Sequence, residues 1–208
     1  MAVKKIVSIT RRKLNALASG CTTLLVRTHR RRWERVARAG APPWDDRNVT
    51  IAGLIPAGSS VLDIGCGAQS LKGHLKERCL YQPCDLVKST PEVVLCDFNA
   101  GIFPRLSKHF DYVVCSGIFE YMRAPQEFLQ QVTSLGSITL LSYHPFRKGD
   151  SKWTRLVSNW VNHFTETELH AIFEQVGLQW KIVHGKGCAQ RIYEIRNPKS
   201  EVRSPNSG

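Results

Sequence analysis

The segment Val61-Leu-Asp-Ile-Gly-Cys-Gly67 decides the fold class of this chain. Residues 61–64 form a short, mostly apolar run, which is typical of a strand buried inside a parallel sheet. Two glycines spaced by one residue follow, and they allow a sharp turn and a close approach of the backbone to a ligand. We expect a helix to begin at about Ser70, so that a ligand beside the turn would face a helix N-terminus.

Strands and helices alternate outward from this segment. Further strands are expected at residues 80–86, 93–96, 110–116, 137–143, 178–183 and 190–196. Pro83 lies inside the second strand and suggests a bulge or irregular pairing there. Thr165-Glu-Thr-Glu168 is a capping box that begins a helix ended by Gly177. The pattern predicts an α/β fold, with a Rossmann-like parallel sheet, helices on both faces and a C-terminal antiparallel strand pair.

The positive charge of the chain is concentrated at its N-terminus. Of 208 residues, 29 are Lys or Arg and 17 are Asp or Glu, which gives a formal net charge of +12. Residues 1–40 hold eleven of the basic residues and one acidic residue, Glu34, so the remainder is nearly neutral. Hydrophobic residues make up 42% of the chain, which excludes a disordered chain, a collagen and a disulfide miniprotein. No apolar stretch is long enough to predict a membrane-spanning helix.

We expect three parts along the chain: a basic helical N-terminal extension at residues 1–43, a domain carrying the motifs at 44–196, and a disordered tail at 197–208. The basic extension fits an interfacial helix on an anionic membrane, phosphate contacts to a nucleic acid, or a merely solvated helix. No nucleic-acid-binding module accompanies it. A cytoplasmic location is expected, with peripheral membrane attachment and a mitochondrial transit peptide left open.

The cysteines number seven, which is odd, and no two have the C-x-x-C spacing of a metal or redox pair. Several lie in apolar runs. They are therefore interpreted as small buried hydrophobes of a reducing compartment, and no metal site is expected. The positions are Cys21, Cys66, Cys79, Cys84, Cys96, Cys115 and Cys188.

Carboxylates stand at or near the ends of three expected strands, where open α/β sheets bind ligands. Asp63 precedes the first glycine and would attract a cationic amino-acid group. Asp85 follows the glycines by about 20 residues, a spacing at which a carboxylate can accept hydrogen bonds from ribose hydroxyls. Asp97 followed by Phe98 suits adenine, because the carboxylate can accept from the exocyclic amine while the ring packs on the base. The structural alternatives are a cap of the following turn for Asp63, a solvated strand end for Asp85 and a turn for Asp97.

The ordered set of motifs resembles the class I S-adenosylmethionine-dependent methyltransferases, and most closely the small "type 11" group. It comprises Val61-Leu-Asp-Ile-Gly-Cys-Gly67, Asp85, Cys96-Asp-Phe98, Phe110-Asp-Tyr-Val-Val-Cys-Ser116 and Phe119-Glu-Tyr121, with support from Phe164–Leu169 and Gly177. The resemblance covers about residues 44–196. It implies transfer of a methyl group from S-adenosylmethionine to an oxygen or nitrogen of a small-molecule, glycan or lipid-linked acceptor.

The resemblance also implies roles for individual residues. Asp63, Gly65 and Gly67 would hold the methionine end of the cofactor, Asp85 the ribose, and Asp97 with Phe98 the adenine. The backbone around Ser116 would receive the amino group or flank the methyl, and Cys66 and Leu86 are expected to line the same site. The sequence departs from many family members at Gln69, where glycine is common.

His144 and Glu120 are the candidate catalytic residues. His144 follows the fifth strand, and its ordinary pKa near neutrality suits a general base for a hydroxyl acceptor; the structural alternative is a histidine that only hydrogen-bonds its loop. Glu120 lies in the motif expected beside the methyl group. The basic, aromatic segment 146–164 fits a lid, or an amphipathic helix that packs Trp153, Leu156, Val157 and Trp160 on the sheet edge.

Two other function classes remain open from the sequence. One is a non-catalytic protein that keeps the S-adenosylmethionine-binding fold and binds RNA or a membrane through its basic extension. The other is a nicotinamide-dependent reductase, which Ser70 at the third glycine position and the carboxylate of Asp63 disfavour.

Overall fold

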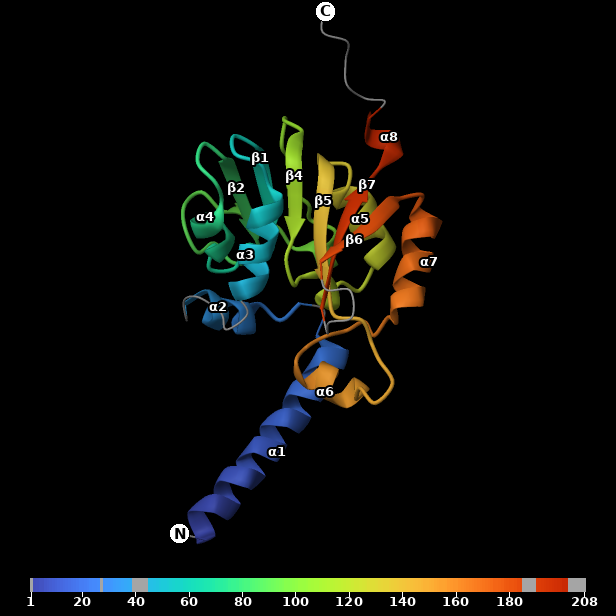
Figure 1. Ribbon diagram of the computed structural model, residues 1–208. Coiled ribbons are helices and arrows are strands. Elements are labelled where there is room, and N and C mark those ends of the chain that lie inside the picture. Colours follow the sequence, from blue (N-terminus) through green and yellow to red (C-terminus); the bar gives the residue numbers. More distant parts are fainter. Residues whose placement is uncertain (1, 27, 39–44, 185–189, 202–208) are drawn as a thin grey trace, which may run out of the picture.

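A seven-stranded mixed sheet forms the centre of the molecule (Figure 1). The computed structural model describes residues 2–26, 28–38, 45–184 and 190–201. The strand order is β3-β2-β1-β4-β5-β7-β6, with β1 to β5 parallel and β7 antiparallel to both β5 and β6. The strands are β1 (Ser60–Ile64), β2 (Leu80–Asp85), β3 (Val94–Leu95), β4 (Phe110–Cys115), β5 (Gly136–Tyr143), β6 (Gln179–His184) and β7 (Arg191–Arg196). The predicted fold class, including the C-terminal antiparallel pair, is confirmed.

Helices cover both faces of this sheet because its strands are apolar on both sides. Val61 packs into a cluster with residues of α3 (Asp45–Leu54) and α4 (Ser70–His74). The next residue, Leu62, packs into the opposite cluster with α5 (Pro125–Val132) and α7 (Glu166–Val176). This alternation is the period of two that a strand imposes. The parallel strands therefore end together at one edge, between the two layers of helices.

Pro83 causes no bulge, contrary to the sequence-based expectation. It pairs in register with Asp63, and the neighbouring Cys84 pairs with Ile64. Strand β3 pairs with β2 only at Cys84 and Asp85, so no strand lies beside Pro83 on that side. A missing backbone donor is tolerated there because the position resembles an edge strand.

The C-terminal helix signals are confirmed. Thr165 and Glu168 form the reciprocal capping box at the start of α7, and Gly177 ends the helix in a left-handed conformation with φ of 77°. Helix α4 is shorter than expected, because Leu75 already has extended backbone angles. The expected tail begins with a short helix, α8 (Pro198–Glu201), and residues 202–208 lie outside the described part.

The basic N-terminal extension is helical, as predicted. It forms α1 (Ala2–Leu25), which points away from the sheet in Figure 1, and α2 (Arg30–Arg38). The C-terminal end of α1 packs on α6 (Lys152–Val157), where the hydroxyl of Ser19 donates to the carbonyl of Val157 at 2.8 Å. Helix α6 thus packs Trp153 against α1, with the ring over Gly20, and reaches the end of β5 through Arg155, which donates a hydrogen bond to the hydroxyl of Tyr143. No helix among the described residues is both long and apolar enough to cross a bilayer.

The expectation of buried cysteines holds for most of those that the structure describes. Four thiols are buried, Cys79 is half-buried and Cys21 is exposed. All six are free thiols, and Cys188 lies outside the described residues.

Candidate active site

The glycine turn after β1 brings the backbone to the edge where the parallel strands end. Gly65 has φ of 75°, and a Cβ at this position would lie 2.5 Å from Cδ1 of Ile118. Gly67 has φ of 52°, and Gln69 is also left-handed with φ of 60°. Glycine would adopt the left-handed backbone at Gln69 without the strain that a side chain brings. A side chain at Gly65 would close the approach to the strand edge.

Asp85, at the end of β2, holds this turn in place through hydrogen bonds. Its Oδ2 accepts a hydrogen bond of 2.8 Å from the Gly67 amide, and its Oδ1 accepts one of 3.0 Å from Val87. Burial raises the pKa of this carboxyl, while the hydrogen bonds from backbone amides oppose the shift. The carboxylate has further lone pairs and lies beside the cavities described below.

Asp63 is the most deeply buried of the three strand-end carboxylates, with 3% of its surface exposed. Its Oδ2 accepts a hydrogen bond of 2.6 Å from the hydroxyl of Tyr81. Burial raises the pKa of Asp63 to about 7, and the nearby charge of Asp85 adds to this effect. A buried carboxyl at the edge of a cavity favours a cationic ligand, which would stabilise its ionised form.

Asp97 caps the short helix η1 (Phe98–Ala100) that follows β3. Its Oδ1 accepts hydrogen bonds from the Ala100 amide at 3.2 Å and from the hydroxyl of Thr28 at 3.0 Å. The ring of Phe98 packs on Phe103 and Phe128, with ring centres 5.4 and 5.5 Å away. Asp97 is thus both a helix cap and an acceptor facing a cavity.

Ser116, at the end of β4, is held by helix α3. Its hydroxyl donates to Oδ1 of Asn48 at 2.6 Å and accepts from Nε of Arg47 at 2.7 Å. The Arg47 guanidinium lies over Gly117, where a Cβ would be 2.5 Å from Nη1. A cation is therefore fixed against the backbone between β4 and η2 (Phe119–Tyr121).

Glu120, in η2, and His144, directly after β5, are joined by a hydrogen bond. Oε1 of Glu120 accepts a hydrogen bond of 3.0 Å from the His144 amide, and its buried Oε2 has no partner among the described residues. Burial raises the pKa of Glu120. Burial and the positive charge of Arg155 lower the pKa of His144, so its imidazole is neutral at pH 7 and can accept a proton.

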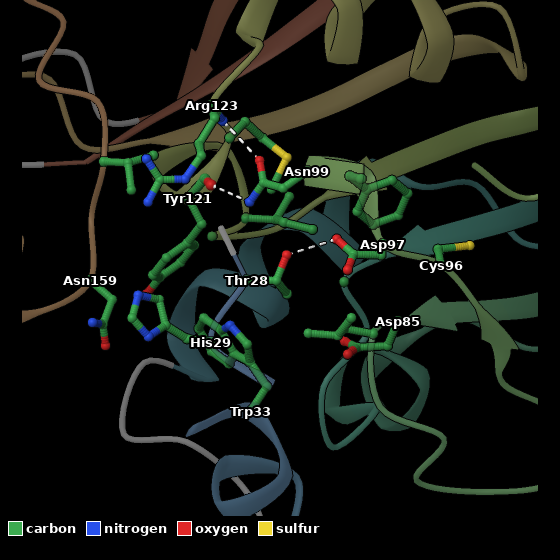
Figure 2. A pocket seen from close by; sticks show the side chains of 17 residues that line it. Thr28, His29, Trp33, Asp85, Cys96, Asp97, Asn99, Tyr121, Arg123 and Asn159 are labelled. Carbon is green, nitrogen blue, oxygen red and sulfur yellow. Dashed lines mark hydrogen bonds between the residues drawn. The ribbon is translucent and has the colours of Figure 1, made fainter. Parts of the chain in front are cut away.

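Two adjoining cavities collect all of these side chains. One, of about 90 Å³, is lined by five of the predicted cofactor residues: Gly65, Asp85, Leu86, Asp97 and Phe98 (Figure 2). The other, of about 330 Å³, is lined by Asp63, Gly65, Cys66, Gly67, Asp85 and Ser116, and by both candidate catalytic residues, Glu120 and His144. Gly65 and Asp85 line both cavities, so the two cavities lie next to each other at the ends of the parallel strands. The structure therefore brings every candidate site residue of the sequence to one place.

The N-terminal extension supplies a wall that the sequence did not predict. Figure 2 shows Thr28, His29 and Trp33 facing Asp85 and Asp97 across the smaller cavity. Arg32 lines the larger cavity and hydrogen-bonds Oδ1 of Asn159. Trp33 is the residue that could have indicated this wall from the sequence. A large aromatic ring in a basic helix gains more free energy when it packs against protein than when it is exposed to water.

Trp160 and Arg155 connect the segment 146–164 to the site. The Trp160 indole donates a hydrogen bond of 3.1 Å to the hydroxyl of Tyr121 and lines the larger cavity. The Arg155 guanidinium lies 4.6 Å from the centre of the Trp160 ring. This segment thus contributes Trp160 to the cavity wall, while its helix packs on α1.

The family model described as a methyltransferase domain matches residues 29–183, which is most of the chain. The chain belongs to the class I S-adenosylmethionine-dependent methyltransferases. Membership of this family supports an enzyme that transfers methyl groups and favours it over a nicotinamide-dependent reductase. Among the residues that the structure describes, no three potential metal ligands converge.

Solved structures share the fold of this methyltransferase. A protein of Nostoc punctiforme PCC 73102 described as an O-methyltransferase matches with a TM-score of 0.62 and 11% identity, over 79% of this chain and 60% of that chain. A methyltransferase from Aquifex aeolicus matches with a TM-score of 0.57 and 14% identity, over 79% and 98% of the two chains. NcsB1, an O-methyltransferase of neocarzinostatin biosynthesis, matches with a TM-score of 0.55 and 18% identity, over 70% and 51%.

This methyltransferase thus spans less than two thirds of the length of the Nostoc protein and of NcsB1. Identities this low show the fold alone. Comparison with curated protein sequences gives no match.

Proposed function

We propose that this enzyme binds S-adenosylmethionine across the two adjoining cavities and transfers its methyl group to an oxygen or nitrogen of a small-molecule, glycan or lipid-linked acceptor. The observation that carries the proposal is the convergence of Asp63, Asp85 and Asp97 on two adjoining cavities, with Asp85 lining both. These carboxylates come from three successive strand ends and suit, in that order, an ammonium, a ribose and an adenine amine.

Arg47 is assigned a part in holding the same ligand. The methionine end of S-adenosylmethionine carries a carboxylate as well as an ammonium. Asp63 suits the ammonium, and the Arg47 guanidinium, fixed by Ser116 in the same cavity wall, suits the carboxylate. This pairing of one buried acid and one cation would balance the charges of the zwitterion.

The sulfonium methyl is already activated when the cofactor is bound, so the protein mainly aligns the acceptor and excludes water. His144 is proposed to take the proton of a hydroxyl acceptor, because its neutral imidazole lines the larger cavity. Glu120 would position His144 through its backbone amide. A small aromatic molecule is one candidate acceptor, because the Trp160 indole in the wall of the larger cavity offers a ring for it to pack on.

The catalytic unit is proposed to include α2. Thr28, His29, Arg32 and Trp33 line the cavities, and the family match begins at residue 29. The boundary expected at residue 44 would divide the site.

Calorimetry with S-adenosylmethionine tests the proposal. Asp85→Asn should weaken binding roughly tenfold to a hundredfold, because a carboxylate acceptor is lost. Glu174→Gln on α7 is the matched control, since Glu174 is exposed on a helix away from the site. Thermal unfolding confirms that both variants are folded. Equal affinity of parent and Asp85→Asn would overturn the placement of the cofactor. In a separate experiment, a mass-spectrometric screen for methylated acceptors would identify the substrate class.

A further inference from the structure

Helix α1 exposes an apolar stripe that no described element covers. Leu14, Leu17 and Leu24 are 61%, 53% and 63% exposed, and Cys21 between them is also exposed. Their spacing of three and four residues places them on one face of the helix. Ser19 and Thr23, which hydrogen-bond α6, lie on another face. A contiguous row of exposed leucines marks an interaction surface.

Most of α1 also stands away from the rest of the molecule (Figure 1). The helix has 24 residues, about 36 Å at 1.5 Å per residue, and its contacts with α6 involve its last turns. A helix of this kind gains little stability in water without a partner for its apolar face. A partner for this helix must therefore match both its exposed apolar row and its charge.

That chemistry is strongly basic. By sequence, α1 carries Lys4, Lys5, Arg11, Arg12 and Lys13 and no acidic residue. At its junction with α2, an open hollow is lined by Arg30, Arg31, Arg32 and Arg35, together with hydroxyls of α1. Arginine clusters recognise phosphate groups. The surface thus combines an exposed apolar row with a site for anions.

Three occupants could cover such a surface, and charge separates them. A second copy of α1 would bring five cations against five, which disfavours self-association. A nucleic acid would contact the arginines but leave the leucines in water. An anionic bilayer satisfies both, because leucines enter the acyl boundary while basic groups meet the lipid phosphates.

We propose that α1 and the arginine hollow form a docking surface for an anionic lipid bilayer. The hollow shares Thr28, His29 and Arg32 with the walls of the cofactor cavities. A lipid phosphate held in the hollow would therefore lie at the mouth of the active site. Docking stands on the surface of α1 and α2, and does not depend on the proposed cofactor or acceptor.

Co-sedimentation of the full chain with vesicles tests the proposal. Vesicles of phosphatidylcholine with phosphatidylglycerol should retain the protein, and vesicles of phosphatidylcholine alone should retain at least tenfold less. The double variant Leu14→Glu/Leu17→Glu should weaken retention at least tenfold, because it removes apolar contact and adds repulsion. The variant Arg30→Gln/Arg31→Gln should weaken it by about tenfold or more, since each basic group contributes roughly fivefold.

Leu80→Glu is the matched control, because Leu80 is also 61% exposed but begins β2, at the end of that strand opposite Asp85 and the cavities. It should bind vesicles like the parent. Equal retention of the parent and Leu14→Glu/Leu17→Glu would overturn the proposal. A dimer in sedimentation velocity that Leu14→Glu/Leu17→Glu dissociates, or RNA retention insensitive to that change, would overturn it in favour of another occupant. Calorimetry without vesicles reports the cofactor proposal separately.

Discussion

The hydroxyl of Thr28 donates a hydrogen bond of 3.0 Å to Oδ1 of Asp97, a residue 69 positions further along the chain. This bond joins the N-terminal extension to the strand end proposed to hold adenine. The extension and the sheet therefore share a wall of the active site (Figure 2).

A double-mutant cycle should detect this coupling. Thr28→Val and Asp97→Ala should each lower the free energy of unfolding by ~1–2 kcal/mol, because each removes a hydrogen bond to a partly buried carboxylate. The double variant should lose less than their sum, with a coupling of ~1 kcal/mol measured by urea unfolding. Thr22→Val is the control, because Thr22 bonds only within α1 and should show no coupling to Asp97. Full additivity for Thr28 and Asp97 would show that the extension does not dock there.

Asp63 should make the free enzyme less stable above neutral pH. Its pKa is about 7 in the folded protein, whereas an unfolded aspartate titrates near ~3.9. The folded state binds the proton more tightly, so the contribution of Asp63 to stability is full below about pH 4 and is lost as the pH rises through 7. Asp63→Asn removes this penalty. At pH 8 the variant should be ~2–4 kcal/mol more stable than the parent, and near pH 4 the two should converge in urea unfolding.

The same substitution should harm cofactor binding. The ammonium of S-adenosylmethionine requires the ionised carboxylate. The Kd of the parent should therefore increase by up to about tenfold for each pH unit below 7. Asp63→Asn should bind at least tenfold more weakly at pH 8 and lose this dependence. A variant that binds as tightly as the parent would place the ammonium elsewhere.

His144→Gln should lower kcat and leave the Kd for S-adenosylmethionine unchanged. Loss of a general base costs roughly 10²- to 10⁴-fold in rate. Burial and Arg155 hold the pKa of His144 below its usual value near ~6.5, so kcat at saturating cofactor should fall only below that pH. Single-turnover rates measured from pH 5 to 8, once an acceptor is known, would check both statements. An unchanged kcat would leave His144 as a hydrogen-bonding residue of its loop.

The sheet, and the convergence of the carboxylates near its strand ends, could be predicted because their signals are local. The carboxyl ends of parallel strands lie at the same edge of a sheet. The glycine turn and the carboxylates near successive strand ends are therefore brought together by the topology alone. The strand pattern was therefore sufficient to predict that Asp63, Asp85 and Asp97 lie close together. Pro83 was misjudged because the sequence does not show that β3 is too short to reach it.

The other wall could not be predicted because it depends on long-range packing. Arg47 lies in α3 and Thr28 in the connection between α1 and α2, and the local sequence around each does not name its distant partner. Those partners, Ser116 and Asp97, are both 69 positions away. Trp153 belongs to an amphipathic helix, but the pattern does not say whether that helix covers the sheet or α1. Its ring lies over Gly20, where a Cβ would be 2.5 Å from it.

Gly65→Ala should be the most damaging single substitution in the glycine turn. The left-handed backbone costs ~1 kcal/mol for alanine, and the new Cβ would meet Cδ1 of Ile118 at 2.5 Å. Together these should lower the free energy of unfolding by ~2–4 kcal/mol and weaken S-adenosylmethionine binding, because Gly65 lines both cavities. Urea unfolding and calorimetry measure the two effects.

Gly58→Ala separates backbone strain from collision. Gly58 has a similar φ of 78°, but a Cβ there has no atom within 4 Å, so this variant should lose only ~1 kcal/mol and bind normally. Ile118→Val removes the Cδ1 atom and should restore part of the stability of Gly65→Ala. Since Cγ1 and Cβ of Ile118 would still be 3.2 and 3.3 Å from the new methyl, the rescue should be incomplete. Equal losses for Gly65→Ala and Gly58→Ala would mean that Ile118 does not pack against the turn, and the narrow approach described for this site would be wrong.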